Sequence, residues 1–196
     1  MLPEKIVFIG VVINLSLSFW YIRSIFRSGT RPNLVSWFIW MLAPFVGTFL
    51  AIKAGAGFSV TGIFMAGFGP LLVIIFSLFK RNAFWKIETF DVVCGIFSIL
   101  AFLLYILTLN LSISILFAII SDGLAAVPTI NKSWKFPESE SISVYLGGII
   151  NNVLSLLVIK NWDFAVYSFN IYFVLINIII IFAIYHKKML YFKNEK

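Results

Sequence analysis

The residue in this sequence with the clearest chemical potential is an acid, Asp122, inside a long apolar segment. The first basic residue after it is Lys132, ten residues later. Ala125, Ala126 and Thr129 follow Asp122 at helical spacing and give it a face of small side chains. An acid inside a membrane span is costly and usually faces the bundle interior. Asp122 therefore suggests a proton-coupling group or a gate; the alternative is a structural hydrogen bond to a neighbouring helix.

Polar side chains recur at seven-residue intervals in the C-terminal third of the chain. Tyr145 and Asn152 form one pair, and Asn170 and Asn177 form another. Residues seven apart lie on one face of a helix. Because an amide offers both a donor and an acceptor, such a face suits a neutral polar solute. Hydrogen bonding between helices is the alternative role.

Two tryptophans, Trp37 and Trp40, lie three residues apart in an earlier apolar stretch. They could form a wall that stacks on a sugar or a base, although aromatic side chains in a membrane protein often simply face lipid. Pro44 follows in the same stretch, and Pro70 and Pro128 lie in two others. A proline inside a helix frees a backbone carbonyl and bends the helix. These three prolines are therefore predicted hinges or kinks.

The composition of the chain requires a membrane. Of its 196 residues, 61% are hydrophobic and 12% are charged, whereas a soluble domain has about 45–50% and about 25%. A water-soluble fold with this composition would expose large apolar patches and aggregate. The single cysteine, Cys94, excludes an intrachain disulfide and a cysteine-based metal site. We predict an all-α integral membrane protein that crosses the plasma membrane several times.

Seven apolar stretches are long enough, at about 20 residues each, to cross the bilayer as helices. Twelve of the 15 Lys and Arg residues fall at one end of this arrangement and three at the other. The positive-inside rule then places the N-terminus outside and the C-terminus in the cytoplasm. The same asymmetry explains the net charge of +7 without a nucleic-acid partner. The predicted spans are 5–26, 34–53, 57–79, 89–108, 109–130, 141–160 and 164–186.

The spans repeat with a period of 107 residues. Shifted by that number, the first three spans superpose on the last three, Ser36 falls on Ser143, and Lys53 falls on Lys160. The span between the two units gives them the same orientation in the membrane. Transporters with such repeats bind their substrate near the midplane, between the repeats. The sequence therefore predicts a 3+1+3 arrangement of parallel repeats, with a first repeat over 1–80, a linker helix over 81–108 and a second repeat with a short basic tail over 109–196.

The end of the fifth span carries a family resemblance. Residues 122–129, Asp-Gly-Leu-Ala-Ala-Val-Pro-Thr, precede a basic loop with several serines at 132–141. Together they resemble a PQ-loop repeat, and residues 21–36 resemble a degenerate copy of it. Thr129 stands where the family has Gln, and Tyr21 stands where the first repeat has Pro. With its seven spans, the chain resembles a divergent, bacterial-type member of the SWEET/PQ-loop transporter superfamily over nearly its whole length.

The resemblance implies a transporter that moves a small polar solute, such as a sugar, by alternating access between two SWEET-like repeats. It would act as a facilitator or as a proton-coupled carrier. Its partners would be the bilayer and the solute, and a homo-oligomer is left open. The alternative is a non-transporting receptor or assembly factor that binds a partner at its cytoplasmic face. The sequence contains no motif of an intramembrane hydrolase or an ATPase and only one histidine. We therefore expect no enzyme activity, cofactor or metal.

Overall fold

The computed structural model describes residues 3–27, 29–80, 84–108 and 110–194. Arg81 and Lys196, two of the basic residues on which the predicted orientation rests, lie outside the described residues. Within the described ranges the chain forms seven α-helices and no strand. They are α1 (Val7–Arg27), α2 (Leu34–Lys53), α3 (Val60–Leu78), α4 (Thr89–Leu107), α5 (Leu111–Lys135), α6 (Ser143–Leu157) and α7 (Phe164–Asn194).

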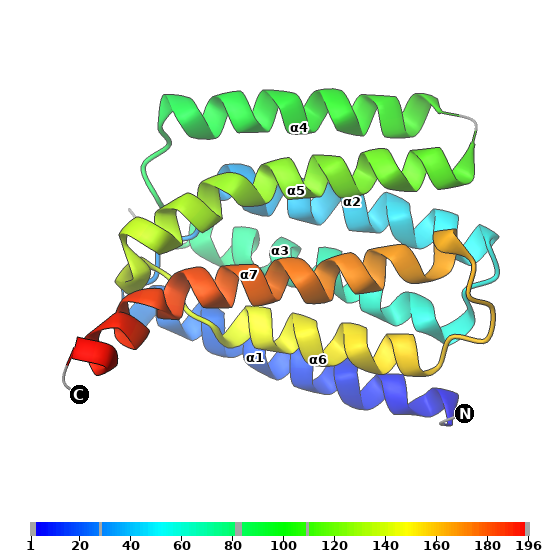
Figure 1. Ribbon diagram of the computed structural model, residues 1–196, viewed down its shortest axis with the longest axis horizontal. Coiled ribbons are helices and arrows are strands. Elements are labelled where there is room, and N and C mark those ends of the chain that lie inside the picture. The colour runs from blue at the N-terminus through cyan, green and yellow to red at the C-terminus, as the bar shows by residue number, and fades with distance from the viewer. Residues whose placement is uncertain (1–2, 28, 81–83, 109, 195–196) are drawn as a thin grey trace.

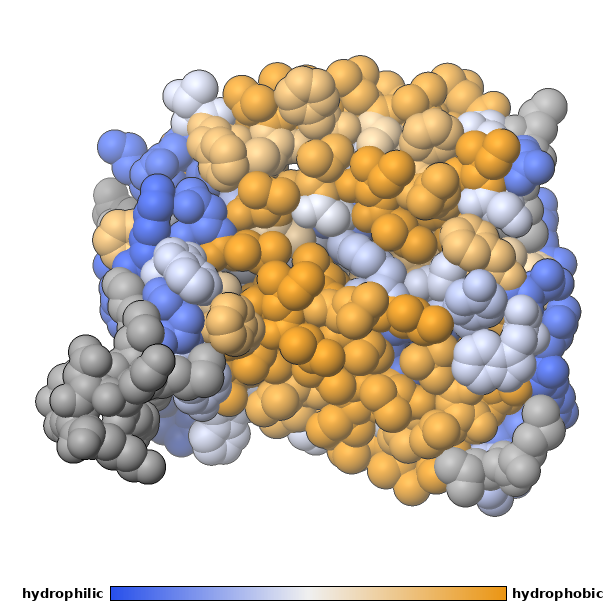
Figure 2. Space-filling view, in the orientation of Figure 1, coloured by the Kyte–Doolittle hydropathy of each residue, from blue (hydrophilic) through white to orange (hydrophobic). Residues whose placement is uncertain are grey.

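Six of the described helical segments, each of 19 to 24 residues, are long and apolar enough to cross a membrane. At 1.5 Å per residue they match a hydrocarbon core of about 30 Å. An apolar band covers the visible side of the bundle, and hydrophilic residues gather at its two ends (Figure 2). The fourth and fifth spans are separate helices, because α4 ends at Leu107 and α5 begins at Leu111. The protein is an all-α, multi-pass membrane protein.

The sixth predicted span is longer than the helix that forms there. The prediction covered 141–160, but α6 contains 15 residues, or about 22 Å of helix. It begins late because Pro137–Ser139 forms a 3-10 turn and Glu140 has an extended backbone. It ends at Leu157, ahead of the segment that leads into α7. Although α6 falls short of the length of the six long spans, it packs alongside α1 and α7 as part of the bundle (Figure 1).

The helices form two groups of three that face each other. In one group α3 packs against both α1 and α2, and in the other α7 packs against both α5 and α6. Between the groups, α1 packs on α6 and α2 packs on α5. The remaining helix, α4, lies outside both groups against α5 (Figure 1). The interface between the groups is therefore lined by six helices.

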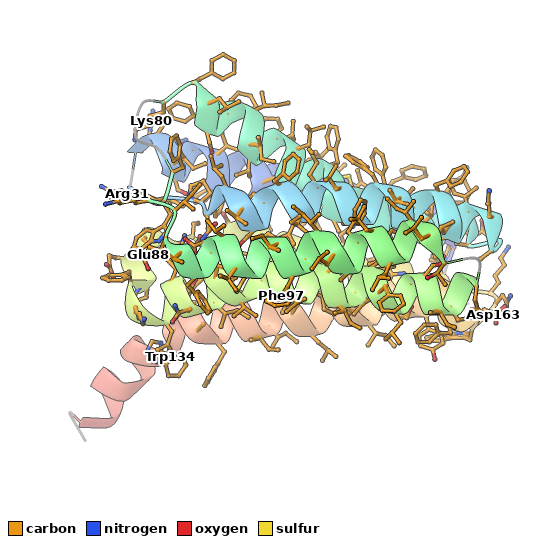
Figure 3. The ribbon with its side chains drawn as sticks, turned by 90° about the horizontal axis from the view of Figure 1, so that it is seen from above. Arg31, Lys80, Glu88, Phe97, Trp134 and Asp163 are labelled. Atoms are coloured by element: carbon orange, nitrogen blue, oxygen red, sulfur yellow. The ribbon has the colours of Figure 1, made fainter. Side chains whose placement is uncertain are left out.

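The loops define two ends of the bundle. Arg31, Lys80, Glu88 and Trp134 lie at one end, and Asp163 lies at the other (Figure 3). We call the first the basic end and the second the opposite end. The helix α5 continues to Lys135, five residues past the predicted end of its span. This extension carries Lys132, predicted as a loop residue, into the protein interior, where it is 3% exposed.

Candidate functional site

A small cavity lies between the two helix groups, with a volume of about 60 Å³. All helices except α4 contribute to its wall, mostly from their middle turns. The structure therefore brings together residues that are more than 100 positions apart in the sequence. Seven of the predicted site residues line the cavity: Trp37, Trp40, Pro70, Asp122, Tyr145, Asn152 and Asn177.

Asp122 is held in the cavity wall by helices of both groups. Its side chain is buried, and the hydroxyl of Tyr172 on α7 donates a hydrogen bond of 2.7 Å to its Oδ2. The indole N–H of Trp40 on α2 donates to the backbone carbonyl of Asp122 at 3.3 Å. The other carboxyl oxygen, Oδ1, is buried without a hydrogen-bond partner. One oxygen is thus fixed by the protein, and the other is free to accept a hydrogen bond.

Three asparagines add further acceptors to the wall. The side-chain nitrogens of Asn152 and Asn177 donate to the carbonyls of Gly148 and Phe173, each four residues earlier, at 2.8 and 2.6 Å. Because these bonds hold the nitrogens against their own helices, the amide oxygens point away from the helix backbone. Asn14 of α1, which the sequence analysis did not single out, also lines the cavity. Its Oδ1 has no hydrogen-bond partner, and neither has that of Asn152.

The predicted tryptophan pair belongs to a compact aromatic layer at the side of the cavity nearer the basic end. Trp37 and Trp40 meet edge to face with ring centres 5.4 Å apart, and Trp40 meets Tyr145 in the same way at 6.5 Å. Tyr21 packs on Trp37 at 5.1 Å. Trp37 is 1% exposed and therefore presents little free ring surface to a solute. In this conformation the layer covers one side of the cavity and offers little flat ring surface on which a solute could stack.

A buried ionic network lies beyond the aromatic layer, at the basic end. Lys132 of α5 forms an ion pair with Glu140, and both side chains are almost inaccessible to solvent. Lys132 also donates to the carbonyl of Arg31 at 2.6 Å. The hydroxyls of Tyr21 and Tyr145 donate to Oε2 of Glu140 at 2.9 and 3.2 Å. This network was not predicted from the sequence, because both charges were assigned to the basic loop at 132–141.

Three of the predicted site residues lie outside the cavity wall. Asn170 is buried on α7, and its amide nitrogen donates to the carbonyl of Val166 at 3.2 Å. Pro44 lies inside α2 and Pro128 inside α5. Both helices continue past their prolines. The hinge role of Pro44, Pro70 and Pro128 stays a prediction.

The site is thus a sequence of layers along the bundle: an ionic network, an aromatic layer, and a cavity walled by a carboxyl group and amide oxygens. Comparisons of the chain with protein-family models, with curated proteins and with solved structures find no match. The resemblance to the SWEET/PQ-loop superfamily therefore stays a prediction. The chemistry of the cavity is the basis for a function.

Proposed function

We propose that the protein transports a small polar solute by alternating access between its two helix groups. The observation that carries this proposal is the cavity between the groups, with a buried acid and unpartnered amide oxygens in its wall. Buried polar atoms are normally paired, and each one left unpaired costs free energy. A bundle with a purely structural role would gain nothing from several unpaired acceptors around one cavity. A solute with hydroxyl or amine donors would satisfy them.

The helix packing supports the 3+1+3 interpretation. In each group the third helix, α3 or α7, packs against both the first and the second helix of that group. Between the groups, the first helix of each packs on the second helix of the other: α1 on α6, and α5 on α2. Two parallel repeats related by an axis along the membrane normal would pack in this way. The repeats would be 1–80 and 109–196, with α4 as the linker. In this proposal the protein lies in the plasma membrane. By the positive-inside rule, its basic end would face the cytoplasm and its N-terminus would lie outside.

The cavity is too small in this conformation for a solute of ordinary size. A volume of about 60 Å³ has room for a few water molecules at most, whereas ligand pockets usually measure about 300–1,000 Å³. The basic end is closed by the ionic network and the aromatic layer. Towards the opposite end, Phe169 and Phe173 pack with Ile63 and Ala51. Solute entry therefore requires the two helix groups to separate at one end.

We propose that Asp122 controls this separation of the two helix groups. Its carboxyl group accepts from Tyr172 on α7 of its own group, and its backbone carbonyl accepts from Trp40 on α2 of the other group. A carboxylate only accepts hydrogen bonds, whereas a protonated carboxyl group also donates one. Gain of a proton would therefore let this carboxyl group donate a hydrogen bond into the cavity between the two groups, and loss of the proton would remove that bond. In this proposal Trp37, Trp40, Tyr145, Asn152 and Asn177 surround the solute, and Asn170 lies behind them.

The first test is thermal stability of the purified protein against a panel of sugars, amino acids, nucleosides and vitamins, at two pH values. A ligand at 100 times its dissociation constant should stabilise the protein by about 2.7 kcal/mol. A hit is then used in radiolabelled form in proteoliposomes, where we expect saturable counterflow. Asp122→Asn should remove the pH dependence of net uptake and leave counterflow intact. Asp163→Asn, the same change at an exposed position of the opposite end, should alter neither.

A folded protein that shows no ligand response and no flux would contradict the transport proposal. The second candidate, a receptor or assembly factor, is supported by a recess of about 480 Å³ at the basic end. Trp20, Glu138 and Tyr185 are among the residues that line it. A partner that co-purifies with the wild type and is lost on Glu138→Lys would favour this candidate.

A further inference from the structure

The recess at the basic end, of about 480 Å³, exists because α6 is short. This helix begins at Ser143, whereas its neighbours α1 and α7 continue further towards the basic end (Figure 1). The chain ahead of α6 forms a 3-10 turn and an extended residue in place of further helical turns. The recess lies over the start of α6, and its wall is formed by α1, by the segment that precedes α6 and by α7.

The recess reaches from the end of the bundle into the depth of the lipid headgroups. Its deepest residue on α1 is Trp20, seven residues before the end of that helix, or about 10 Å along its axis. The headgroup layer on each side of a bilayer is about 5–8 Å thick. Trp20 is 62% exposed, and Ile142 and Ile184 also line the recess. A molecule that fills it therefore meets apolar side chains at one end and polar ones at the other, as a phospholipid does.

The charge of the recess differs from that of the surrounding surface. The charged residues that line it are two acids, Glu138 and Glu140, and none of its described lining residues is basic. Glu140 is occupied by Lys132 and two tyrosines, so that Glu138, which is exposed, presents the available carboxylate. A basic protein surface attracts anionic headgroups in general. The recess instead favours a headgroup with a positively charged end.

A positive group stands beside the recess on its α1 side. The guanidinium group of Arg23, which is exposed, lies over the ring of Trp20 at 5.7 Å. A guanidinium group binds phosphate through paired N–H donors, and a carboxylate accepts hydrogen bonds from an ammonium group. We infer that the recess binds phosphatidylethanolamine, with the phosphate at Arg23 and the primary ammonium at Glu138.

A lipid in this position would contact both helix groups, since α1 belongs to one and α6 and α7 belong to the other. The inference does not rest on the transport proposal, because the recess and its charges are separate from the central cavity. A lipid response and a solute response are different measurements, and either can fail without the other.

The test is thermal unfolding of the purified protein in detergent micelles that contain increasing amounts of one phospholipid. All the lipids carry dioleoyl chains, and the headgroups are phosphatidylethanolamine, its mono- and dimethylated forms, phosphatidylcholine and phosphatidylglycerol. We expect the unfolding temperature to rise with phosphatidylethanolamine and to saturate, as it does for a ligand that binds the folded state. Each added methyl group removes an N–H donor. The half-saturating concentration of phosphatidylcholine should therefore be at least about tenfold higher, the lower value for loss of a hydrogen bond to a charged group.

Three variants locate the effect. Glu138→Gln should raise the half-saturating concentration of phosphatidylethanolamine to that of phosphatidylcholine, because it removes the charge and keeps the size of the side chain. Arg23→Gln should weaken both lipids by the same factor, since both carry the phosphate. Glu88→Gln is the matched control, at an exposed acid of the same end outside the recess (Figure 3). Its lipid response, measured against its own unfolding temperature without lipid, should equal that of the wild type.

Three results would overturn the inference. Equal responses to phosphatidylethanolamine and phosphatidylcholine would mean that the ammonium group is not recognised. A stronger response to phosphatidylglycerol would assign the recess to anionic lipids. A response that Glu138→Gln leaves unchanged would place the lipid elsewhere. If no phospholipid stabilises the protein and a partner protein is lost on Glu138→Lys, the recess binds that partner and the inference is wrong.

Discussion

Two buried polar regions of this molecule differ in how completely their groups are paired. At the basic end, Glu140 accepts from Lys132, Tyr21 and Tyr145. Around the cavity, Oδ1 of Asp122 and Oδ1 of Asn14 have no partner. A buried charge inside a membrane protein suggests function in either place. The difference in hydrogen-bond pairing distinguishes the roles of the two regions. At the basic end the charges are paired with one another and form a structural contact, whereas the unpaired acceptors of the cavity wall can still bind a ligand.

The largest effect is expected at the paired region, on substitution of Glu140 by alanine. The change leaves the buried ammonium group of Lys132 without its carboxylate. Removal of one partner of a buried ion pair costs about 3–5 kcal/mol. We therefore expect a loss of this size in the free energy of unfolding, measured by titration with sodium dodecyl sulfate and followed by circular dichroism.

Glu138→Ala is the control for this prediction. Glu138 is an exposed acid two residues before Glu140, and its removal should change the free energy of unfolding by no more than about 0.5 kcal/mol. Equal losses in the two variants would contradict the distinction between a paired, buried network and its solvated surroundings.

An intermediate effect is expected for Gly62→Ala, at the boundary of the unpaired region. The added methyl group would press on the side-chain oxygens of Asn152, Ser155 and Asn170, three buried residues of α6 and α7. Overpacking of this kind costs about 1–3 kcal/mol. At Gly123 of α5 the same methyl group would meet only Tyr172, at an ordinary distance of 3.6 Å. Gly123→Ala should therefore stabilise the protein by up to about 1 kcal/mol through helix propensity. Unfolding titrations should show changes of opposite sign.

The limits of the spans could be predicted closely from the sequence, because hydropathy and length decide which segments enter a bilayer. The second span was predicted as 34–53 and is Leu34–Lys53. The prediction was wrong where tertiary pairing overrides hydropathy. Lys132 looks like the end of a span, but Glu140, from beyond the helix, pairs with it and allows α5 to continue.

The candidate site could be predicted in part for a similar reason. Asp122, Asn152 and Asn177 were recognised because a polar group is rare inside an apolar span. Asn14 gave the same signal in the first span and was overlooked. Asn170 and Asn177 share a helical face, but seven residues correspond to about 10 Å along the axis. A cavity of about 60 Å³ reaches only one of them. Tyr172 gave no signal, since a tyrosine is ordinary in a membrane helix.

The smallest effect is expected from removal of a single hydroxyl in the paired region. Tyr21→Phe leaves Glu140 with Lys132 and Tyr145, so the loss should be the net value of one hydrogen bond, about 0.5–1.5 kcal/mol. Tyr172→Phe is the matching change at the cavity, where it leaves neither oxygen of Asp122 with a hydrogen-bond partner among the described residues. Its cost should be larger, about 1–3 kcal/mol, because a buried acceptor is left unsatisfied. If unfolding titrations gave the larger loss for Tyr21→Phe, the ionic network would be the less completely paired of the two regions, and the assignment of the cavity as the binding site would lose its physical basis.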